Sequence, residues 1–377
     1  MDSSTTLRWG KTPWTIDFHP DPGPLPEKVD FAVVGGGFTG LAAAAWLRHL
    51  APQNTVAVFE AEEIGAGSSG HTGGLALAET AAGDLPGLGD VLAGLSKVLR
   101  ELQIVADLVL PGVWELNRTV SSSNSPISWN DSGNLRVAQQ VPGGTLNPGK
   151  LVTGLARAAA KNGALIFEHA RVKSIAFEEA VKLTTSEKQI RARRVLVATN
   201  AQSLELSDLA GQAQPKFTLA LATQPLTDLQ LEALGLASGK PFYTIDLPYL
   251  WGRSLDGNRT IFGSGLVHLN DWRELLTLDV AAGEAAKLLD GLGRRVRDLH
   301  PALKDVRFSH SWGGPILIAD QWQPVFRHHP ADPRGIVLGA YSGHGVALSV
   351  YLGCWAAEAM LDRRGLPAWS RSPSETG

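Results

Sequence analysis

The pattern of apolar and polar positions is most regular between residues 29 and 74. Asp30–Val34 is a short apolar run of the kind that forms a buried parallel strand, and Leu41–Leu50 is alanine-rich with high helix propensity. Thr55–Phe59 predicts a second strand, which ends at the acidic residue Glu60. A strand, a helix and a second strand in this order predict an α/β unit that binds a dinucleotide.

Three glycines between the first strand and the helix form the pattern G-x-G-x-x-G. Gly35 permits the tight turn, Gly37 lets the backbone approach a pyrophosphate, and Gly40 lets helix and strand pack closely. Phosphate then binds the free N–H groups at the helix start. Glu60 follows at the spacing expected of an acid that accepts the ribose hydroxyls, which disfavours NADP. Such a motif also arises by chance in a chain with 41 glycines, but the strand, the helix and Glu60 argue against chance.

A second glycine-rich loop follows Glu60, where a simple nucleotide fold would begin its next helix. Residues 65–74, GAGSSGHTGG, contain five glycines and two serines. Small side chains and exposed backbone donors suit close wrapping of a larger cofactor. This loop favours FAD over NAD, although an NAD-dependent dehydrogenase remains an alternative.

After residue 74, the periodicity predicts two helical segments, then a strand-rich region, and then a final strand, loop and helix. Residues 84–118 are predicted to be largely helical and to lie on the substrate side, and residues 147–162 are predicted to form a helix. Residues 206–308 are strand-rich, with a hairpin turn at Asp256–Asn258 and one helix over about 280–299. The chain then returns to a strand at 336–338, a loop at 339–345 and a helix at 346–362.

The composition describes a globular protein. Of the 377 residues, 44% are hydrophobic and 19% charged, and the net charge of -3 gives no drive toward nucleic acid or anionic membrane. Cys354 is the single cysteine, so no intrachain disulfide can form. We find neither a signal peptide nor an apolar run long enough to span a membrane, and we expect a cytoplasmic protein. The oligomeric state is left open.

Four segments carry a resemblance to a known family. VVGGGFTGL, FEAEEIGAGSSGHTGG, SWGGP and GAYSGHGVAL, in this order, resemble the D-amino-acid oxidase (DAO) superfamily of FAD-dependent amine oxidoreductases. Within it, they are most similar to the gamma-glutamylputrescine oxidoreductase branch. The resemblance implies an α/β fold of the glutathione-reductase/DAO type, with a Rossmann-type FAD-binding domain and a discontinuous antiparallel-sheet substrate domain. The substrate domain would form the roof of the pocket over the flavin.

This resemblance also implies a division of the chain into domains. The FAD-binding domain would comprise residues 29–80, 147–205 and 309–364. The substrate domain would comprise residues 81–146 and 206–308. Residues 1–28, rich in proline, would form an extended arm that packs on its own domain or on a neighbour, and residues 365–377 would form a tail.

The predicted cofactor-binding residues come from every part of the first domain. They are Gly35, Gly37, Phe38, Thr39, Gly40, Glu60, Ala61, Gly67, Ser68, Ser69, His71, Thr72, Gly73, Gly74, Val172, Thr199, Asn200, Gly314, Gly343, His344, Gly345 and Val346. His71 is either a flavin contact, even a covalent one, or a loop histidine that makes a hydrogen bond. The start of the last helix is predicted to stabilise the anionic pyrimidine edge of reduced flavin.

The candidate substrate-side residues are Tyr249, Trp251, Arg253, Trp312 and His344. For each, ordinary packing or helix capping is the competing interpretation. Relatives that oxidise free amino acids often hold the carboxylate with an arginine at two places, which correspond here to glycines near Gly313 and Gly343. This difference disfavours a simple α-amino acid, although Arg253 or Arg327 could bind an anion from another direction.

The predicted function is an FAD-dependent amine oxidase or dehydrogenase. It would oxidise the C–N bond of a small amine or amino-acid derivative to an imine, which water hydrolyses to a carbonyl. No second nucleotide motif is present, so the electron acceptor would be oxygen or another carrier. The ten histidines show no metal-site spacing, and no metal is expected. A flavin dehydrogenase of a hydroxy acid and a non-catalytic flavin-binding protein remain alternatives.

Overall fold

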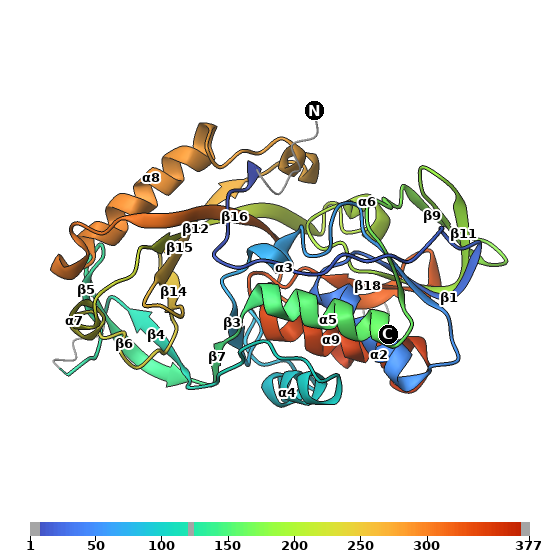
Figure 1. The fold of residues 1–377 in the computed structure, drawn as a ribbon, viewed down its shortest axis with the longest axis horizontal. Coiled ribbons are helices and arrows are strands. Elements are labelled where there is room, and N and C mark those ends of the chain that lie inside the picture. Colours follow the sequence, from blue (N-terminus) through green and yellow to red (C-terminus); the bar gives the residue numbers. More distant parts are fainter. Residues whose placement is uncertain (1–7, 120–123, 371–377) are drawn as a thin grey trace.

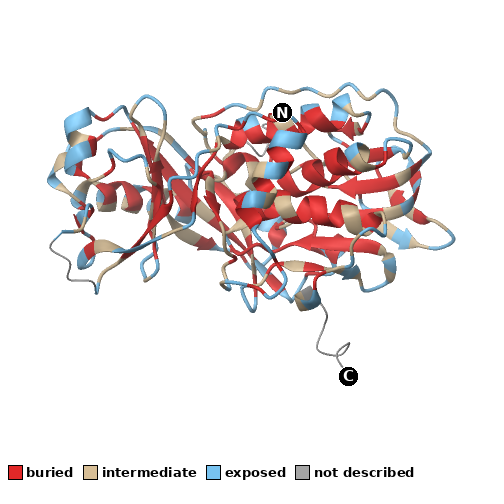
Figure 2. Cartoon of the chain, turned by 90° about the horizontal axis from the view of Figure 1, so that it is seen from below, coloured by how far each residue is buried: buried red, intermediate tan, exposed pale blue. Residues whose placement is uncertain are grey.

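A computed structural model of the chain describes residues 8–119 and 124–370. Within these residues, the main body consists of two eight-stranded sheets. Figure 1 shows them at opposite ends of an elongated molecule, with the long strands of the second sheet extending toward the first. Figure 2 shows that each end has its own buried interior.

The first sheet is built around the strand predicted at residues 30–34. Its order is β17-β18-β11-β1-β2-β8, and β10 and β9 extend it from β11. Its strands are β1 (Lys28–Val34), β2 (Val56–Phe59), β8 (Leu165–Phe167), β9 (Ser174–Phe177), β10 (Val181–Thr184), β11 (Gln189–Val197), β17 (Val325–His329) and β18 (Asp332–Gly339). Because β1 pairs in parallel with both β11 and β2, the carboxyl ends of three strands meet at one edge, next to the glycine turn.

Helices cover this sheet and cross one another closely. They are α2 (Phe38–Leu50), α3 (Ser68–His71), α4 (Val91–Glu101), α5 (Pro148–Lys161), α6 (Leu204–Ser207) and α9 (Gly345–Met360). A Cβ atom on Gly353 of α9 would lie 2.6 Å from the carbonyl oxygen of Thr39 in α2, so a glycine is needed at this crossing. The first and last helices of the fold are thereby packed against each other.

The second sheet is largely antiparallel and has the order β16-β12-β15-β14-β13-β4-β6-β5. Its strands are β4 (Val113–Asn117), β5 (Ser128–Asn130), β6 (Asn134–Val141), β12 (Ala213–Thr223), β13 (Phe242–Thr244), β14 (Trp251–Ser254), β15 (Thr260–His268) and β16 (Phe308–Ala319). The outer elements are α7 (Asp228–Ala233), η1 (Trp272–Leu276), α8 (Gly283–Asp298) and η2 (Pro301–Leu303). Helix α8 packs on β12 and β15. The opposite face of the sheet is turned toward the first half of the molecule.

Two small strands and the amino-terminal arm join the halves. β3 (Leu75–Leu77) pairs with β7 (Gly143–Thr145). The arm runs along the edge of β16, where Gly313 N donates to Trp9 O at 2.9 Å. Trp9 is fully buried, and the Trp14 indole donates to Gly70 O at 2.7 Å. The arm from residue 8 onward therefore packs on its own chain, directly behind the second glycine-rich loop.

The structure differs from three sequence predictions. Residues 84–118 are helical only over α4, because Gln103 and Asp107 have left-handed φ angles of 57° and 51°, and residues 113–117 pair as a strand instead. Helix α4 packs on α9, not on the substrate side. Residues 308–319 belong by their pairing to the second sheet, although the predicted boundary placed 309 onward in the first domain.

The end of the chain is only partly covered. Residues 368–370 form the short helix η3 (Ala368–Ser370), and the predicted tail beyond residue 370 lies outside the described residues. Within the described chain, no helix combines the length and the apolar character needed to cross a membrane.

Candidate functional site

A cavity of about 940 Å³ lies between the two halves. On one side it is lined by the glycine turn after β1, the end of β2 and the loop at 67–73. On the other side it is lined by strands of the second sheet and by the segment 243–251. Segments more than 250 residues apart in the sequence therefore share one cavity.

The glycine turn has the geometry that its pattern predicts. Gly35 has a φ of +111°, and a Cβ atom there would lie 2.6 Å from Ala198 O. A Cβ on Gly40 would lie 1.9 Å from Gly35 O, so only glycine lets α2 approach the turn. The amino-terminal cap of α2, Gly37, has no side-chain hydrogen bond, and the first turn contains no acid. This helix start is thus suited to phosphate.

Glu60 closes β2 and lines the cavity beside this turn. Its Oε2 accepts from Gly36 N at 2.7 Å, and its Oε1 accepts from Glu62 N at 2.9 Å. Burial raises the pKa of Glu60, against the backbone donors, which lower it. The carboxylate is therefore fixed in place beside the glycine turn, where it can accept hydroxyl hydrogen bonds.

Part of the second glycine-rich loop forms the short helix α3, which packs on β16 and α5. Ser69 Oγ accepts from Phe38 N at 2.9 Å and so connects this loop to the start of α2. His71 is buried, and its Nδ1 lies 2.9 Å from Gly67 O. Because burial lowers the pKa of His71, the ring is neutral near pH 7. The hydrogen bond to the loop backbone agrees with the simpler of the two interpretations of this residue.

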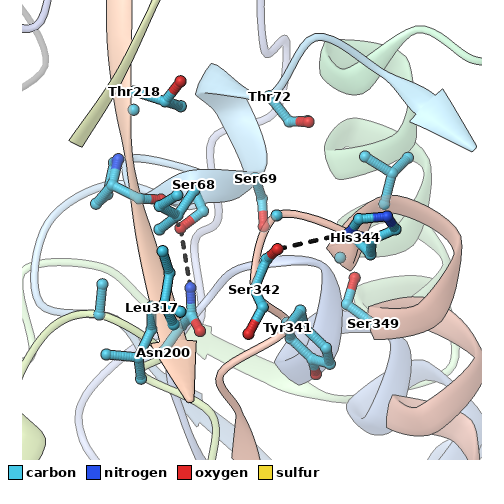
Figure 3. A pocket seen from close by; sticks show the side chains of 18 of the residues that line it. Ser68, Ser69, Thr72, Asn200, Thr218, Leu317, Tyr341, Ser342, His344 and Ser349 are labelled. Carbon is cyan, nitrogen blue, oxygen red and sulfur yellow. Dashed lines mark hydrogen bonds between the residues drawn. The ribbon is translucent and has the colours of Figure 1, made fainter. Parts of the chain in front are cut away.

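Asn200 ties together three segments around the cavity. Its Nδ2 donates to Ser68 Oγ at 3.1 Å, and its Oδ1 accepts from Ala340 N at 3.0 Å. Ser68 Oγ in turn donates to Pro315 O at 2.6 Å. Figure 3 shows the hydrogen bond between Asn200 and Ser68, with Ser342 nearby. The end of β11, the glycine-rich loop and the loop before α9 thereby form one wall.

A second tie connects the same C-terminal loop to α2. The hydroxyl groups of Tyr341 and Thr39 lie 2.7 Å apart. The loop itself contains left-handed φ angles at Ala340, Ser342 and Gly343, of 55°, 51° and 90°. His344 follows as the cap of α9 without a side-chain cap bond, and its ring faces the cavity (Figure 3).

A row of paired residues crosses the sheet, and its three middle members, Trp251, Tyr243 and Glu115, line the cavity. From β15 to β6, the directly paired residues are Gly263, Trp251, Tyr243, Glu115 and Gln139. A Cβ on Gly73 would lie 2.1 Å from the Trp251 ring, and one on Gly263 would lie 2.0 Å from it. Trp251 therefore lies against the backbone of both halves, and two glycines make room for it.

Most predicted site residues line this cavity. Twenty of the residues that do so come from the cofactor set and two more from the substrate set: Gly35, Gly37, Phe38, Thr39, Glu60, Ala61, Gly67, Ser68, Ser69, His71, Thr72, Gly73, Val172, Thr199, Asn200, Gly314, Gly343, His344, Gly345 and Val346, with Tyr249 and Trp251. Gly40 and Gly74 do not line it. They are packing positions, since a Cβ on Gly74 would lie 2.4 Å from Leu146 O.

Arg253 and Trp312 are also outside the cavity, contrary to their predicted place. Arg253 is 6% exposed, and burial lowers its pKa to about 10. Trp312 is fully buried, packs on Trp14, and donates from its indole to His71 O at 2.9 Å. Arg327 lies in β17, where it bonds to Asp208 O at 3.2 Å. Arg253 lies two residues beyond Trp251 in β14 and so shares its face of the sheet, but only Trp251 lines the cavity.

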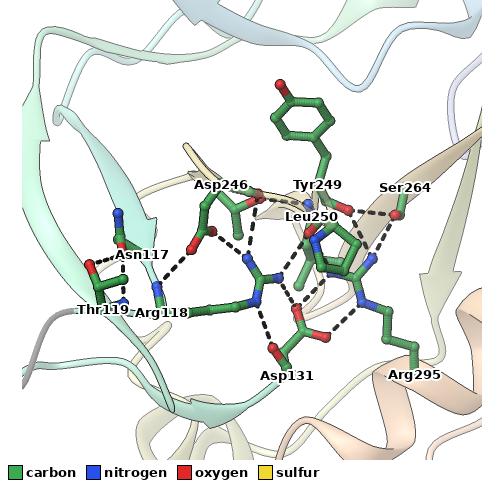
Figure 4. Close-up of polar contacts among 11 residues, drawn as sticks. Asn117, Arg118, Thr119, Asp131, Asp246, Tyr249, Leu250, Ser264 and Arg295 are labelled. Carbon is green, nitrogen blue, oxygen red and sulfur yellow. Dashed lines mark hydrogen bonds and ion pairs between the residues drawn. The ribbon is translucent and has the colours of Figure 1, made fainter. Parts of the chain in front are cut away.

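A buried ionic network supports the loop that carries Tyr249. The Asp131 carboxylate accepts from Arg118 and Arg295, each at 2.6 Å, and Arg118 also pairs with Asp246. Arg295 donates to Tyr249 O at 2.8 Å. Figure 4 shows both guanidinium groups converging on Asp131 while the Tyr249 ring points away from them. This network fixes the backbone of the loop and leaves its side chains at the cavity.

Comparison with known proteins decides the family. The family model described as "DAO: FAD dependent oxidoreductase" matches residues 30–142 and 133–359. The chain belongs to the DAO family of FAD-dependent oxidoreductases. This confirms the predicted family and its cofactor FAD, and it removes the NAD-dependent dehydrogenase from the alternatives.

Relatives and solved structures agree with this assignment. The chain is 27% identical to "Probable oxidoreductase OrdL" of Rhizobium meliloti (90% of this chain, 85% of the relative). It is also 27% identical to the gamma-glutamylputrescine oxidoreductase of Escherichia coli (88% and 83%). Among solved structures, glycine oxidase from Geobacillus kaustophilus has a TM-score of 0.71 at 19% identity (90% and 96%). L-proline dehydrogenase from P. horikoshii has a TM-score of 0.69 at 18% identity (92% and 97%). The predicted branch and fold class are confirmed.

The residues of this DAO-family cavity fit FAD. Two buried hydroxyl groups that line it, Thr199 Oγ1 and Ser349 Oγ, have no hydrogen-bond partner among the described residues. Buried polar groups without partners are rare in folded proteins, so a ligand is the expected partner. Together with the open helix start and Glu60, they provide positions for a pyrophosphate, a ribose and a polar ring.

Several cavity residues were not predicted from the sequence. Glu79 and Glu115 line the cavity around Tyr243, and His268 lines it with its Nδ1 2.9 Å from Lys216 Nζ. None of these residues belongs to a local motif. They come together only because distant strands pair in one register, and no local sequence pattern predicts that register. In the described part of the chain, no group of three or more His, Cys, Asp or Glu is arranged to hold a metal ion.

Proposed function

We propose that this protein oxidises the C–N bond of a small amine and passes the electrons to oxygen or another acceptor. The observation that carries the proposal is the single cavity, which joins the cofactor side to an aromatic and acidic sheet surface. FAD, when bound, supplies the two-electron oxidant. The amine R–CH2–NH2 loses two electrons and two protons to give R–CH=NH, which water hydrolyses to R–CHO and ammonia.

The residues of the chain would bind and orient the amine. Trp251 and Tyr249 would hold its carbon chain, since aromatic faces also attract cations. The amine must be in its neutral, unprotonated form before it is oxidised. His344 is a candidate to take the proton from its ammonium form, because burial lowers the pKa of this histidine and leaves it neutral. The backbone of Thr72 and Gly73 would close the cavity beside the reacting carbon.

The choice of an amine over a free α-amino acid is supported by one relative and by the absence of arginines at two positions. The Escherichia coli relative is named for gamma-glutamylputrescine, whereas the structural neighbours glycine oxidase and L-proline dehydrogenase are named for amino acids. In this chain, the positions near Gly313 and Gly343 carry no arginine. A Cβ on Gly313 would point at Phe217, 2.0 Å away, and not into the cavity.

An anaerobic screen of the purified yellow protein tests the proposal. Amines, α-amino acids and hydroxy acids are each added, and the loss of oxidised-flavin absorbance is followed. We expect bleaching by amines. Bleaching by hydroxy acids alone would replace the proposal with a C–OH dehydrogenase, and no bleaching by any compound would favour a non-catalytic flavin-binding protein.

A further inference from the structure

The acidic part of the cavity contains two carboxylates that share one phenol. Tyr243 OH donates toward Glu115 Oε1 and lies 3.0 Å from Glu79 Oε1. Gln139 Nε2 donates to the other oxygen of Glu115 at 2.6 Å. Burial and the two carboxylates raise the pKa of Tyr243, so the phenol stays protonated. Within the described residues, the hydrogen-bond partners of these two carboxylates, Tyr243 and Gln139, are neutral.

Glu115 is 7% exposed and lines the cavity. A buried carboxylate is ordinarily paired with a cation or coordinated to a metal, because removing its charge from water is costly. Among the described residues, neither Glu115 nor Glu79 forms an ion pair with a lysine or arginine. Nearby His344 does not supply the charge, since burial lowers its pKa and keeps it neutral.

Two basic residues near the cavity have other partners, and Arg253 is buried beside Gly74, outside the cavity. Arg171, which lines it at the Glu60 end, lies 4.0 Å from the Glu62 carboxylate. The ammonium group of Lys216 forms a hydrogen bond with the ring of His268. Lys216 is also four residues along β12 from Ala220, the residue paired with Gly263 in the row, a separation of about 13 Å. The acidic pair is therefore left for a positive charge that enters with the ligand.

We propose that Glu115 and Glu79, bridged by Tyr243, bind a second ammonium group of the substrate, so that the preferred substrate is a diamine. This inference rests on the proposed amine oxidation. Glu115 lies two strands from Trp251 along the row, about 10 Å away, and Trp251 lies against Gly73 of the cofactor loop. One ammonium would sit between the carboxylates while the other end of the molecule reaches the cofactor side.

The unpartnered hydroxyl of Ser349, noted above, also indicates a polar ligand in this cavity. The residue is 4% exposed, and its hydroxyl has no partner in the described structure. It lies on α9, the helix that contacts β3, and Glu79 is the second residue after β3. A ligand with several N–H donors would serve this hydroxyl as well as the carboxylates.

The kinetic test compares 1,5-diaminopentane with n-pentylamine, using the FAD-bound enzyme under anaerobic conditions. We expect kcat/KM for flavin reduction to be at least about 30-fold higher for the diamine, the effect of one buried charge pair. Glu115→Gln should abolish this preference, because it should lower kcat/KM for the diamine far more than kcat/KM for n-pentylamine. Glu232→Gln, an exposed carboxylate on α7, is the matched control and should keep the preference.

Two further variants distinguish a binding role of the acidic pair from a general effect of misfolding in Glu115→Gln. Glu79→Gln should reduce the preference, and Tyr243→Phe should reduce it less, because both carboxylates remain. An equal loss of both reactions in Glu115→Gln, with the preference intact in Glu79→Gln, would show a structural role and overturn the inference. The absence of any preference in the wild-type enzyme would overturn it as well.

A binding measurement separates this inference from the proposed reaction. Pentamethylene bis(trimethylammonium), which cannot form an imine, is titrated into the holoenzyme by calorimetry. We expect binding to the wild-type protein that weakens at least about 30-fold in Glu115→Gln. If amines fail to reduce the flavin but this dication still binds in a Glu115-dependent manner, only the proposed reaction has failed. If amines reduce it and the dication does not bind, the acidic pair has no such role.

Discussion

The two sides of the cavity are built by different means. On the cofactor side, the ligand-facing groups are mainly backbone N–H groups and small side chains, and glycines such as Gly35 and Gly40 make this possible. On the sheet side, they are large side chains whose neighbours come from other strands, such as Tyr243 beside Glu115. The first kind of surface is encoded locally, whereas the second exists only when distant strands pair in one register.

Replacing Gly40 tests the locally encoded side and should have the largest effect. In Gly40→Ala, the new Cβ would lie 1.9 Å from Gly35 O and 3.0 Å from a Val33 methyl group. We expect the free energy of unfolding to fall by about 3 kcal/mol or more, with loss of bound FAD. Denaturant unfolding and flavin absorbance measure both. Gly291→Ala, on α8 with no atom within 4 Å, is the control and should be neutral or stabilising.

Asp131 tests the side that depends on distant pairing. Its side chain is 3% exposed, and in Asp131→Asn both arginines lose their carboxylate. We expect a loss of about 3–5 kcal/mol in unfolding free energy, as for other broken buried pairs. Asp362→Asn, in an exposed pair with Arg194, should change stability much less. Equal effects would mean that the network does not support the sheet.

The same carboxylate gives a pH dependence with a defined sign. Burial raises the pKa of Asp131, but hydrogen bonds and charges from Arg295 and Arg118 lower it overall. A folded-state pKa below the unfolded value of about 4 means that this contribution is complete at neutral pH. It is lost as the pH falls through the folded-state pKa. Thermal unfolding of Asp131→Asn should therefore depend less on pH below about 4 than that of the wild-type protein.

Replacing Glu60 tests the cofactor side and should have an intermediate effect, on the affinity for FAD. Glu60→Gln keeps the shape but removes the charge that would accept the ribose hydroxyls. The dissociation constant of FAD should rise by about 10-fold to 100-fold, the effect of one hydrogen bond to a charged group. Titration of the apoprotein with FAD measures it. Glu63→Gln, exposed in the same segment, should leave the affinity unchanged.

Tyr341 should give the smallest effect. Tyr341→Phe removes the hydroxyl that lies 2.7 Å from Thr39 Oγ1 and joins the C-terminal loop to α2. We expect a loss of about 1 kcal/mol in unfolding free energy with FAD retained. A large loss of FAD would show that this tie, and not the glycine turn, holds the cofactor side together.

The sequence predicted the two sides to different extents for the same reason. Gly35, Gly37 and Glu60 lie within one local unit, so their spacing predicted the strand, the turn and the acid. Residues 84–118 were predicted as helix because the leucines of α4 have helical spacing, but β4 forms only through pairing with β6 and β13. For the same reason, no sequence pattern indicated that Glu115 would lie beside Tyr243.

The placement of Arg253 and Trp312 shows a related limit. Alternation along a strand indicates which side chains share a face, but not where a cavity on that face ends. Trp312 shares the face with Ala220 and Trp251, yet the loop at His71 covers it. Arg253 lies two residues beyond Trp251 on the same face and is buried next to Gly74. The cofactor and substrate roles of the residues that do line the cavity stay predictions.

Single-turnover product analysis tests the proposed C–N oxidation most directly. The FAD-bound protein is mixed anaerobically with an excess of 1,5-diaminopentane, and the carbonyl product, ammonia and reduced flavin are quantified. We expect one equivalent of carbonyl and one of ammonia for each flavin reduced. Flavin that remains oxidised, or that is reduced without release of ammonia, would contradict it.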